Sequence, residues 1–308
     1  MNILVTGGAG FIASHIVDEY INLGHRVIVI DNLSTGKIDF LNKKAIFHKA
    51  DIRSKKEIEI IIQKEKPEVI NHHAAQISVR NSVDDPINDA EINLKGLLNI
   101  LESAKYYHLK KIIFASSGGV VYGDAKIIPT PENYLPLNPI SPYGITKLAS
   151  EYYLQFYQNN YKIPYVVLRY SNVYGPRQNP HGEAGVVAIF SKKLLRNEQP
   201  TINGDGKQTR DYVFVGDVVK ANTYALKESI VGTYNIGTGQ ETDVNSIYIK
   251  IKKVVGTNTK ALYGVPKSGE QKRSCLDIAK ANNTLDWIPE ITLDQGIVNT
   301  VEYFRKNE

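Results

Sequence analysis

The sequence predicts an α/β protein with a doubly wound parallel sheet and a smaller C-terminal α/β domain. Through about the first 170 residues, short apolar runs alternate with helical patterns, which is typical of a parallel sheet with helices on both faces. After residue 175 glycine and proline become frequent and the alternation is lost. We therefore expect a first domain at 1–175, rejoined by about 206–242, and a second domain formed mainly by 176–308.

The pattern predicts the individual elements as follows. Buried strands are expected at 2–6, 27–30, 45–49, 69–72, 111–115 and 165–170. Helices between them are expected at 14–23, 54–66, 87–107 and 143–161. In the rest of the chain we expect helices at 187–197, 218–226, 278–285 and 293–304, strands at 210–215 and 234–237, and a helix cap at Asp217.

Composition excludes several classes of protein. The 308 residues are 42% apolar and 22% charged, and the net charge of +5 is interspersed along the chain, so we expect no nucleic-acid partner. No apolar run approaches the ~20 residues of a membrane span, and no leader pattern follows Met1. Cys275 is the only cysteine, which rules out an internal disulfide and favours a reducing compartment. We therefore expect a cytoplasmic protein that does not contact a membrane.

The first strand runs into a glycine turn typical of dinucleotide binding. Gly7 permits a tight turn, and Gly10 lets the main chain approach a pyrophosphate at the start of a helix. Ala13 occupies the position of the third glycine, an accepted variant. Asp31, 21 residues beyond Gly10, ends the second strand, where a carboxylate binds the adenosine ribose. Because an acid there repels a 2′-phosphate, the motif predicts NAD rather than NADP.

A second motif joins a strand end to a helix. The strand at 111–115 ends in Ser116 and Ser117, and a helical pattern begins near Tyr143, with Lys147 four residues later. Tyr143 and Lys147 therefore share one face of the helix, where a lysine cation favours the phenolate. Ser117 is placed to hold an alcohol or ketone in front of that tyrosine. In a chain with 19 tyrosines a surface Tyr and Lys would also give this spacing, so the motif gains weight only from the rest of the sequence.

Polar residues at the carboxyl ends of other strands are expected to converge on the same crevice. His73 follows the fourth strand and Asn172 the sixth, while Asp51 and Ile52 follow the third and are placed to touch adenine. His72 and His73 are adjacent on a strand, so they point to opposite faces, and no Cys or acid cluster completes a zinc set. We therefore expect no metal and assign the histidines to packing beside the cofactor.

Basic residues in the second domain allow two interpretations. Arg210 and the loop around Lys267, Lys272 and Arg273 lie near glycine-containing loops. They are either solvated surface charges or part of an anion site, and both possibilities stay open.

Together these motifs resemble the extended short-chain dehydrogenase/reductases and, within them, the UDP-glucose 4-epimerase family. The resemblance runs from Met1 to about Phe304 and is carried by 7–13, Asp31, Ser117, Tyr143 with Lys147, 169–175 (RYSNVYG) and 210–213 (RDYV). It implies a Rossmann domain whose NAD stays bound through turnover, a nucleotide-sugar-binding C-terminal domain, and 4-epimerisation of a UDP-hexose through a transient 4-keto sugar. Tyr143 would move the proton of the 4-hydroxyl, Ser117 would hydrogen-bond its oxygen, and Lys147 would bind the nicotinamide ribose and depress the tyrosine pKa.

The resemblance also implies the residues that contact each ligand. Cofactor contacts are expected from Gly7, Gly10, Phe11, Ile12, Asp31, Asn32, Thr35, Asp51, Ile52, His73, Ala74, Ala75, Asn93, Ala115, Tyr143, Lys147 and Tyr170. Contacts with the UDP-sugar are expected from Ser117, Tyr143, Asn172, Val186, Thr201, Asn203, Arg210, Lys267, Glu270 and Ser274. Resembling proteins pair the helices at 87–107 and 143–161 across a two-fold axis, which implies a homodimer.

The chain departs from the family pattern at several positions. Residues 116–122 are one residue longer than usual, so the choice of Ser117 depends on where the extra residue is placed. Asn203 stands where many members have an aromatic ring, and Lys267 and Glu270 replace the usual Arg and Asp; lysine cannot offer the bidentate fork. Ser274 is small where a bulky Tyr excludes N-acetylated sugars, so we expect N-acetylated UDP-hexoses to enter as well.

Alternative activities differ in what they would require. A dTDP-glucose 4,6-dehydratase would need an Asp-Glu pair where Gly118 and Gly119 stand, so dehydration is not expected. UDP-glucuronate 4-epimerase stays open, although no additional cation for its carboxylate is identified. A non-catalytic NAD-binding regulator on the same scaffold also stays open, but it would have no reason to combine Ser117, Tyr143 and Lys147.

Overall fold

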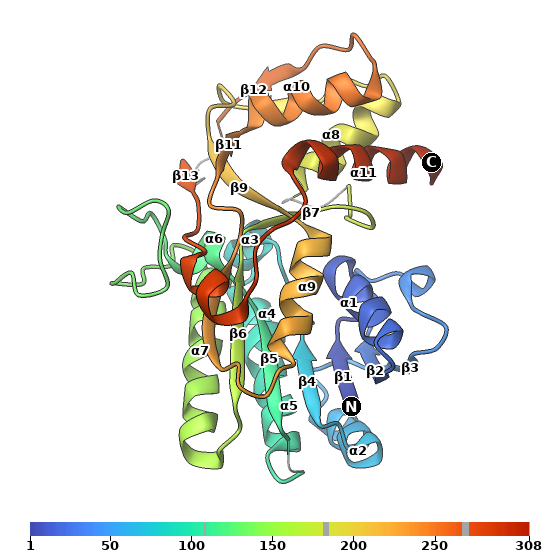
Figure 1. Ribbon diagram of the computed structural model, residues 1–308, viewed down its shortest axis with the longest axis vertical. Helices are drawn as coiled ribbons and strands as arrows, with labels where there is room; N and C mark the ends of the chain where they lie inside the picture. Colours follow the sequence, from blue (N-terminus) through green and yellow to red (C-terminus); the bar gives the residue numbers. More distant parts are fainter. Residues whose placement is uncertain (108, 181–184, 267–270, 308) are drawn as a thin grey trace.

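A seven-stranded parallel sheet forms the centre of the larger part of the molecule (Figure 1). The computed structural model describes residues 1–107, 109–180, 185–266 and 271–307. The strand order is β10-β6-β5-β4-β1-β2-β3, and every neighbouring pair is parallel. The strands are β1 (Asn2–Thr6), β2 (Arg26–Asp31), β3 (Ile46–Lys49), β4 (Val69–His72), β5 (Lys111–Ser117), β6 (Tyr165–Tyr170) and β10 (Gly232–Ile236).

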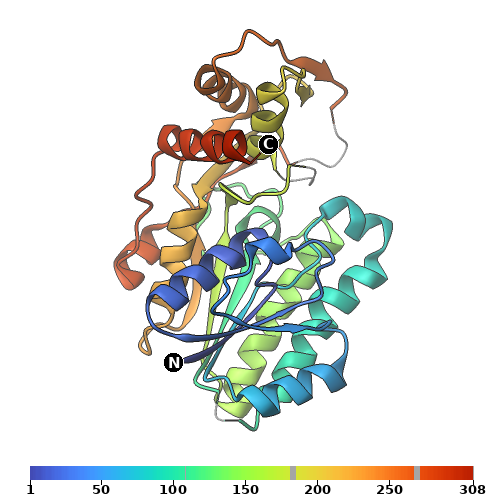
Figure 2. The same cartoon turned by 90° about the vertical axis from the view of Figure 1, so that its right-hand side faces the viewer.

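Helices cover both faces of this sheet (Figure 2). On one face lie α1 (Phe11–Asn22) and α9 (Val215–Ala225); on the other lie α2 (Lys55–Glu65), α5 (Gly96–Ala104) and α7 (Pro142–Tyr161). Successive strand residues serve the two faces in turn: in β1, Ile3 and Val5 pack towards α1, while Leu4 packs towards the opposite helices, and all three are fully buried. The predicted doubly wound sheet is confirmed.

The helix expected at 87–107 is divided into three segments. It begins as α4 (Pro86–Ala90), widens into a π-helix (Glu91–Lys95), and continues as α5. The wide turn carries the buried side chain of Asn93 inward, where it is hydrogen-bonded. A π-helix inside a longer helix often marks a functional site. Two short helices, α3 (Val79–Asp84) and α6 (Gly118–Val121), were not expected; α6 follows β5 directly and begins with Gly118 and Gly119.

The smaller part of the molecule lies beyond the carboxyl ends of the strands (Figure 1). Its central strand β9 (Thr209–Phe214) pairs with β7 (Asn172–Tyr174), β11 (Glu241–Asp243) and β13 (Arg273–Ser274), while β8 (Thr201–Asn203) pairs with β12 (Leu262–Gly264). Helices α8 (Val186–Leu195), α10 (Val244–Val255) and α11 (Leu293–Lys306) pack against each other. Their shared core contains Phe190, Ile247 and Val301.

Two expectations for this region are wrong or incomplete. Helix α9 begins at Val215, so Asp217 lies inside its first turn and does not cap it. The buried Asp217 carboxylate instead accepts hydrogen bonds from the backbone N–H groups of Glu290 (3.0 Å) and Ile291 (3.2 Å). Helix α10, whose N-cap is Asp243, was not predicted at all. A 3₁₀ turn (Ile38–Phe40) and a π-helix (Ala281–Leu285) complete the described elements.

The chain returns to the large sheet after leaving it. Helix α9 packs against α1, and β10 then pairs with β6 at the edge of the sheet. The buried Lys111 of β5 fixes this return, because its ammonium donates to the carbonyls of Ala225 (3.1 Å), the last residue of α9, and of Ile230 (2.7 Å), which follows the helix. In the described part of the chain, no helix combines the length and apolarity needed to cross a membrane.

Candidate active site

The loop between β1 and α1 brings main-chain segments into close contact. Gly7 has φ +70°, and a Cβ there would lie 2.8 Å from the backbone nitrogen of Ala74. Gly8, which sequence reasoning did not single out, packs against Val29, whose methyl group would lie 2.6 Å from a Cβ. Gly10 precedes α1 and has no side chain to cap it, so the first N–H groups of this helix can bind an anion. The residues present therefore fit a dinucleotide pyrophosphate.

Asp31 ends β2 next to this loop. Its Oδ2 accepts a hydrogen bond from the backbone N–H of Ala9 (3.0 Å), and its Oδ1 accepts one from the N–H of Leu33 (2.7 Å). A Cβ on Gly36 would lie 3.0 Å from Oδ2, so the chain after β2 closes around the carboxylate. Asp31 and the glycine turn, predicted as parts of one motif, are in contact through Ala9.

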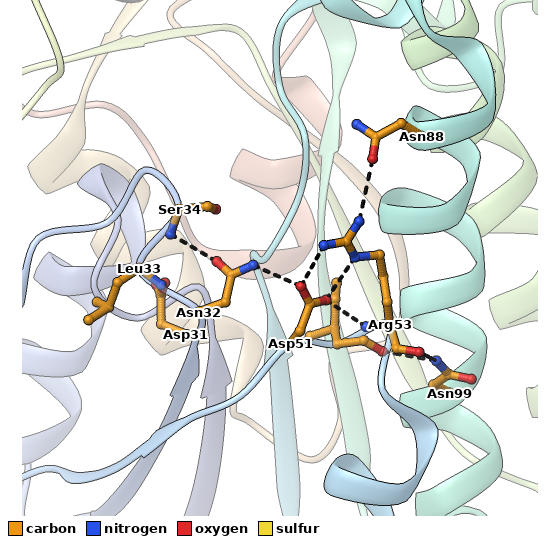
Figure 3. Close-up of polar contacts among 9 residues, drawn as sticks. Asp31, Asn32, Leu33, Ser34, Asp51, Arg53, Asn88 and Asn99 are labelled. Carbon is orange, nitrogen blue, oxygen red and sulfur yellow. Dashed lines mark hydrogen bonds and ion pairs between the residues drawn. The ribbon is translucent and has the colours of Figure 1, made fainter.

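A polar cluster continues from the end of β2 towards α4 (Figure 3). Asn32 Nδ2 donates to Asp51 Oδ2 (3.0 Å), and Arg53 donates two hydrogen bonds to the same carboxylate, from Nε (3.1 Å) and Nη2 (2.8 Å). The hydrogen bonds from Arg53 lower the pKa of Asp51 to about 2. Arg53 also lies 3.4 Å from Asn88 of α4. Sequence reasoning missed Arg53, because an arginine after a strand is usually a surface charge.

Other predicted cofactor residues lie along the same edge of the sheet. Phe11 and Ile12 begin α1, Thr35 lies in the loop after β2, Ile52 follows β3, Ala74 and Ala75 follow β4, Ala115 lies in β5, and Tyr170 ends β6.

Ser117, Tyr143 and Lys147 come together where β5 ends and α7 begins. Tyr143 and Lys147 face inward, with 9% and 4% of their surface exposed. The Ser117 hydroxyl lies close enough to the phenol of Tyr143 to lower its pKa. The Lys147 ammonium lies 5.8 Å from the centre of the tyrosine ring and donates to the carbonyl of Ala115 (2.8 Å). The alternative that Tyr143 and Lys147 are exposed surface residues of the helix is therefore wrong.

The neighbouring Ser116 has a different environment. Its hydroxyl donates to Glu151 (2.5 Å), which forms a buried ion pair with Arg169 (2.6 Å). Arg169 also donates to the hydroxyl of Tyr122 (2.8 Å). Ser117 is therefore the serine beside the phenol, and Ser116 belongs to a separate buried network.

Burial changes the pKa values of the tyrosine and the lysine in opposite directions. It raises the pKa of Tyr143; the Asp89 carboxylate raises that pKa further, and the Ser117 hydroxyl lowers it. Burial lowers the pKa of Lys147 to about 8, against the opposing effects of Asp89 and Glu151. The direction for Tyr143 is opposite to the one expected from a neighbouring lysine, because removal from water penalises the charged form of each group.

The two histidines after β4 point to opposite sides, as predicted. His72 Nδ1 lies 2.8 Å from Thr6 Oγ1, whereas His73 Nε2 lies 3.1 Å from the hydroxyl of Tyr170, and the rings of His73 and Tyr170 stack. Burial and the charge of Lys147 lower the pKa of each histidine to about 3, so both rings are neutral. His73 Nδ1 is buried and has no hydrogen-bond partner within the described residues. No three acidic, Cys or His side chains of the described segments are arranged to hold a metal.

Asn93 belongs to a buried polar network that joins the π-helix to α7. Its Oδ1 accepts from the backbone N–H of Gln76 (2.8 Å), and its Nδ2 donates to Asp89 (2.9 Å). Asp89 also accepts from the hydroxyl of Thr146 (2.8 Å), next to Lys147. Sequence reasoning missed Asp89 and Thr146, because an Asp in a polar helical stretch gives no sign of burial.

The predicted substrate residues lie in the smaller part of the molecule. Asn172 begins β7, Val186 begins α8, and Thr201 and Asn203 are the ends of β8. Arg210 of β9 is paired in register with Ser274 of β13, so the sheet brings these two together. Ser274 is buried, and Arg210 is half-buried. Lys267 and Glu270 lie outside the described residues.

Known proteins match the chain over nearly its whole length. Residues 3–237 match the NAD dependent epimerase/dehydratase family. A Methanocaldococcus jannaschii protein provisionally named UDP-glucose 4-epimerase is 52% identical over 307 residues, 99% of each chain. The crystal structure of Thermotoga maritima UDP-glucose 4-epimerase with UDP-glucose superposes with a TM-score of 0.97 at 49% identity, covering 100% of this chain and 99% of that one. The UDP-glucose 4-epimerase of Thermus thermophilus, in complex with NAD, gives 0.95 at 42% identity and 99% coverage of both chains. The chain belongs to the NAD dependent epimerase/dehydratase family.

Proposed function

We propose that the protein is an isomerase that interconverts the C4 epimers of a UDP-hexose, UDP-glucose and UDP-galactose, with bound NAD and a transient 4-keto sugar. The observation that carries this proposal is the burial of Tyr143 and Lys147 next to Ser117, at the same carboxyl edge of the sheet as the glycine turn and Asp31. The relatives described above, one with UDP-glucose and one with NAD, support the same activity.

The chain offers a complete set of groups for NAD. The N-terminus of α1 would hold the pyrophosphate, and Asp31 would hold the adenosine ribose. Asn32 and Asp51 would contact the adenine, and His73 and Lys147 would contact the nicotinamide half. When bound, NAD supplies the site that accepts the hydride from C4 of the sugar and returns it.

Tyr143 acts on the proton. Its phenolate takes the proton of the sugar 4-hydroxyl and later gives it back to the 4-keto oxygen, so the tyrosine is unchanged after one turnover. Ser117, which lies near the phenol, holds the same sugar oxygen. Because burial opposes the phenolate, positive charge must lie close to Tyr143 during the reaction, and the chain provides Lys147.

The smaller part of the molecule binds the UDP-sugar in this proposal. Asn172 and Arg210 hold the diphosphate, Val186 and the β8 residues Thr201 and Asn203 contact the uridine side, and Lys267 and Glu270 complete the set by resemblance to the family. Ser274 lies beside Arg210 and is small, which leaves room for an N-acetyl group at C2. We include N-acetylated UDP-hexoses among the substrates for this reason.

The domain organisation follows the path of the chain. In this proposal residues 1–171, rejoined by α9 and β10, form the NAD-binding domain, and most of the remaining chain forms the substrate domain. The strands β7 and β9 lie inside the expected ranges 1–175 and 206–242, but they pair in the sheet of the smaller part. The separate core of α8, α10 and α11 and the return of β10 to the large sheet support this division. The buried free thiol of Cys275 supports a reducing cytoplasm as the site of action.

A homodimer accounts for the apolar surface of two neighbouring helices. On α4 and α7, Ile87, Ile145, Tyr152 and Phe156 are exposed, Ile87 to 74%. Beside them a surface hollow of about 450 Å³ is lined by Pro86, Ile87, Ala90, Glu91, Leu94, Lys95 and Leu98. Such a contiguous apolar surface is typical of a protein interface. Light scattering should give twice the chain mass of 34.4 kDa, and Ile87→Glu should give the monomer; a wild-type monomer at micromolar concentration would contradict the dimer.

Incubation with UDP-galactose, without added cofactor, tests the activity directly. UDP-glucose should form, and denaturation should release NAD and not NADP. Tyr143→Phe is expected to reduce turnover by about 10²–10⁴-fold with little change in substrate binding. The matched control is Tyr106→Phe, at a tyrosine that is 74% exposed. Near-normal turnover by Tyr143→Phe would refute the proposed role of Tyr143 as the base. Turnover of UDP-glucuronate but not of UDP-galactose would show that the substrate is the uronate.

A further inference from the structure

The buried carboxylate of Asp89 is hydrogen-bonded to Thr146, which stands between the two proton-transfer residues in the sequence. Asp89 is completely buried at the end of α4, where the π-helix begins. Three side chains donate hydrogen bonds to it: Gln76 Nε2 (2.9 Å), Asn93 Nδ2 (2.9 Å) and Thr146 Oγ1 (2.8 Å). All three neighbours donate to the carboxyl oxygens, which is the arrangement that a carboxylate accepts.

The carboxylate is connected to the first two turns of α7. Thr146 stands between Tyr143 and Lys147 in the sequence, and all three side chains are buried. The hydrogen bond from Thr146 therefore ties the segment that carries the tyrosine and the lysine to α4. Lys147 needs a nearby anion, because its ammonium is buried and its hydrogen bond goes to the neutral carbonyl of Ala115.

The other ionisable groups around Lys147 are less suited than Asp89 to be this anion. Glu151, one turn further along α7, is already paired with Arg169. His72 and His73 of β4 are neutral for the reasons given above. The charged groups on the elements around Asp89 face solvent or pair with each other: Arg80, Asp84 and Asp85 are exposed, and Glu91 pairs with Lys95 at 3.6 Å.

The charge of Asp89 also affects the pKa values of both proton-transfer residues. The Asp89 carboxylate raises the pKa of Lys147, and its effect there is larger than that of Glu151. It also raises the pKa of Tyr143. Removal of this one charge therefore lowers both pKa values, while loss of a hydrogen bond alone does not.

We propose that Asp89 is a positioning residue for the proton-transfer pair: through Thr146 it fixes the start of α7, and its carboxylate is the buried counter-ion of the Lys147 ammonium at longer range, without a direct ion pair between them. The charge of Asp89 then sets the pH range in which Lys147 is protonated beside Tyr143. The kinetic consequence rests on the function proposed above, whereas the charge state of Lys147 does not.

The test compares Asp89→Asn, which removes the charge but keeps the shape, with Thr146→Val, which removes the hydrogen bond but keeps the charge. In protein labelled with [ε-¹³C]lysine, NMR titration follows Lys147, whose signal is identified by its loss in Lys147→Arg. We expect Asp89→Asn to lower the titration midpoint of Lys147 by about one pH unit or more, and Thr146→Val to leave it in place. The pH profile of kcat/KM for UDP-galactose should move to lower pH in Asp89→Asn only.

An unchanged Lys147 midpoint in Asp89→Asn, or an equal shift in Thr146→Val, would overturn the proposal. If wild-type protein lacks epimerase activity but the Lys147 midpoint shifts as expected, the proposed function fails and the counter-ion role stands. If Asp89→Asn does not fold, the double variant Asp89→Asn/Lys147→Met decides: recovery of folding supports the counter-ion, and continued loss of folding refutes it.

Discussion

The turn after β1 permits a sharp test of why a glycine stands at position 7. In Gly7→Ala, the new Cβ would lie 2.8 Å from the nitrogen and 2.9 Å from the Cα of Ala74, and 3.0 Å from the carbonyl carbon of His73. These are backbone atoms, so no side-chain rotation relieves the overlap. The residue must also keep φ near +70°, which L-residues rarely adopt.

Gly24 provides a matched control, because it has φ +80° but no atom within 4 Å of the Cβ position. The left-handed conformation costs an L-residue about 1–2 kcal/mol, and Gly24→Ala should lose only that. Gly7→Ala should lose a further 1–3 kcal/mol or so, the usual cost of forcing extra atoms into a packed region. With about 2–4 °C per kcal/mol for domains of roughly 150–250 residues, the two melting temperatures should differ by several degrees.

Thermal unfolding followed by circular dichroism measures this difference. The amount of NAD released on denaturation gives a second readout, because the overlap displaces the turn that faces the pyrophosphate. We expect reduced NAD content in Gly7→Ala and full content in Gly24→Ala. Equal melting temperatures and equal NAD content in the two variants would refute the view that close main-chain approach requires Gly7.

Three further perturbations test other parts of the site. Ser274→Tyr should sharply reduce kcat/KM for UDP-N-acetylglucosamine and barely change it for UDP-glucose; an unchanged ratio would show that Ser274 is not the gate. Arg169→Met leaves the buried carboxylate of Glu151 unpaired and should lower the free energy of unfolding by about 3–5 kcal/mol, whereas Arg305→Met, at an exposed pair, should change it by less than about 1 kcal/mol; equal losses in denaturant unfolding would argue against this account. The pKa of Lys147, about 8 in the folded chain, lies below its unfolded value of about 10.4, so the folded chain binds fewer protons between these pH values and stability from this group rises as pH increases through that window. Lys147→Met should lack that rise, and an unchanged pH dependence of melting would contradict the lowered pKa.

Local sequence signals predicted the features that depend on local backbone. Gly7 and Asp31 could be placed because a strand, a tight turn and a helix impose fixed spacings. The strands were located because parallel strands buried on both faces leave continuous apolar runs. The pairing of Tyr143 with Lys147 followed from the helical period alone.

Features that depend on distant parts of the chain could not be predicted. Asp89 is identified as buried only when partners from positions 76, 93 and 146 surround it. Asp217 has the right residue type for a helix cap, but the segment around Glu290 recruits its carboxylate. Helix α10 was missed because Ile and Lys alternate in residues 249–252, a strand-like period, although Val244, Ile247 and Ile251 form its buried stripe. The opposite shift of the Tyr143 pKa likewise depends on burial that spacing does not show.

The late return of β10 has a consequence for synthesis of the chain. Val166, Val167 and Leu168 of β6 are fully buried, and β10, whose Gly232 pairs with Val166, follows about 66 residues later. A ribosome that adds about 5–20 residues per second needs several seconds to make that stretch. Throughout that time β6 presents an apolar strand with unpaired hydrogen-bonding groups, the kind of edge on which chains associate wrongly. A fragment that ends near residue 175 has the same open edge permanently, so we expect it to aggregate rather than fold into a separate NAD-binding unit.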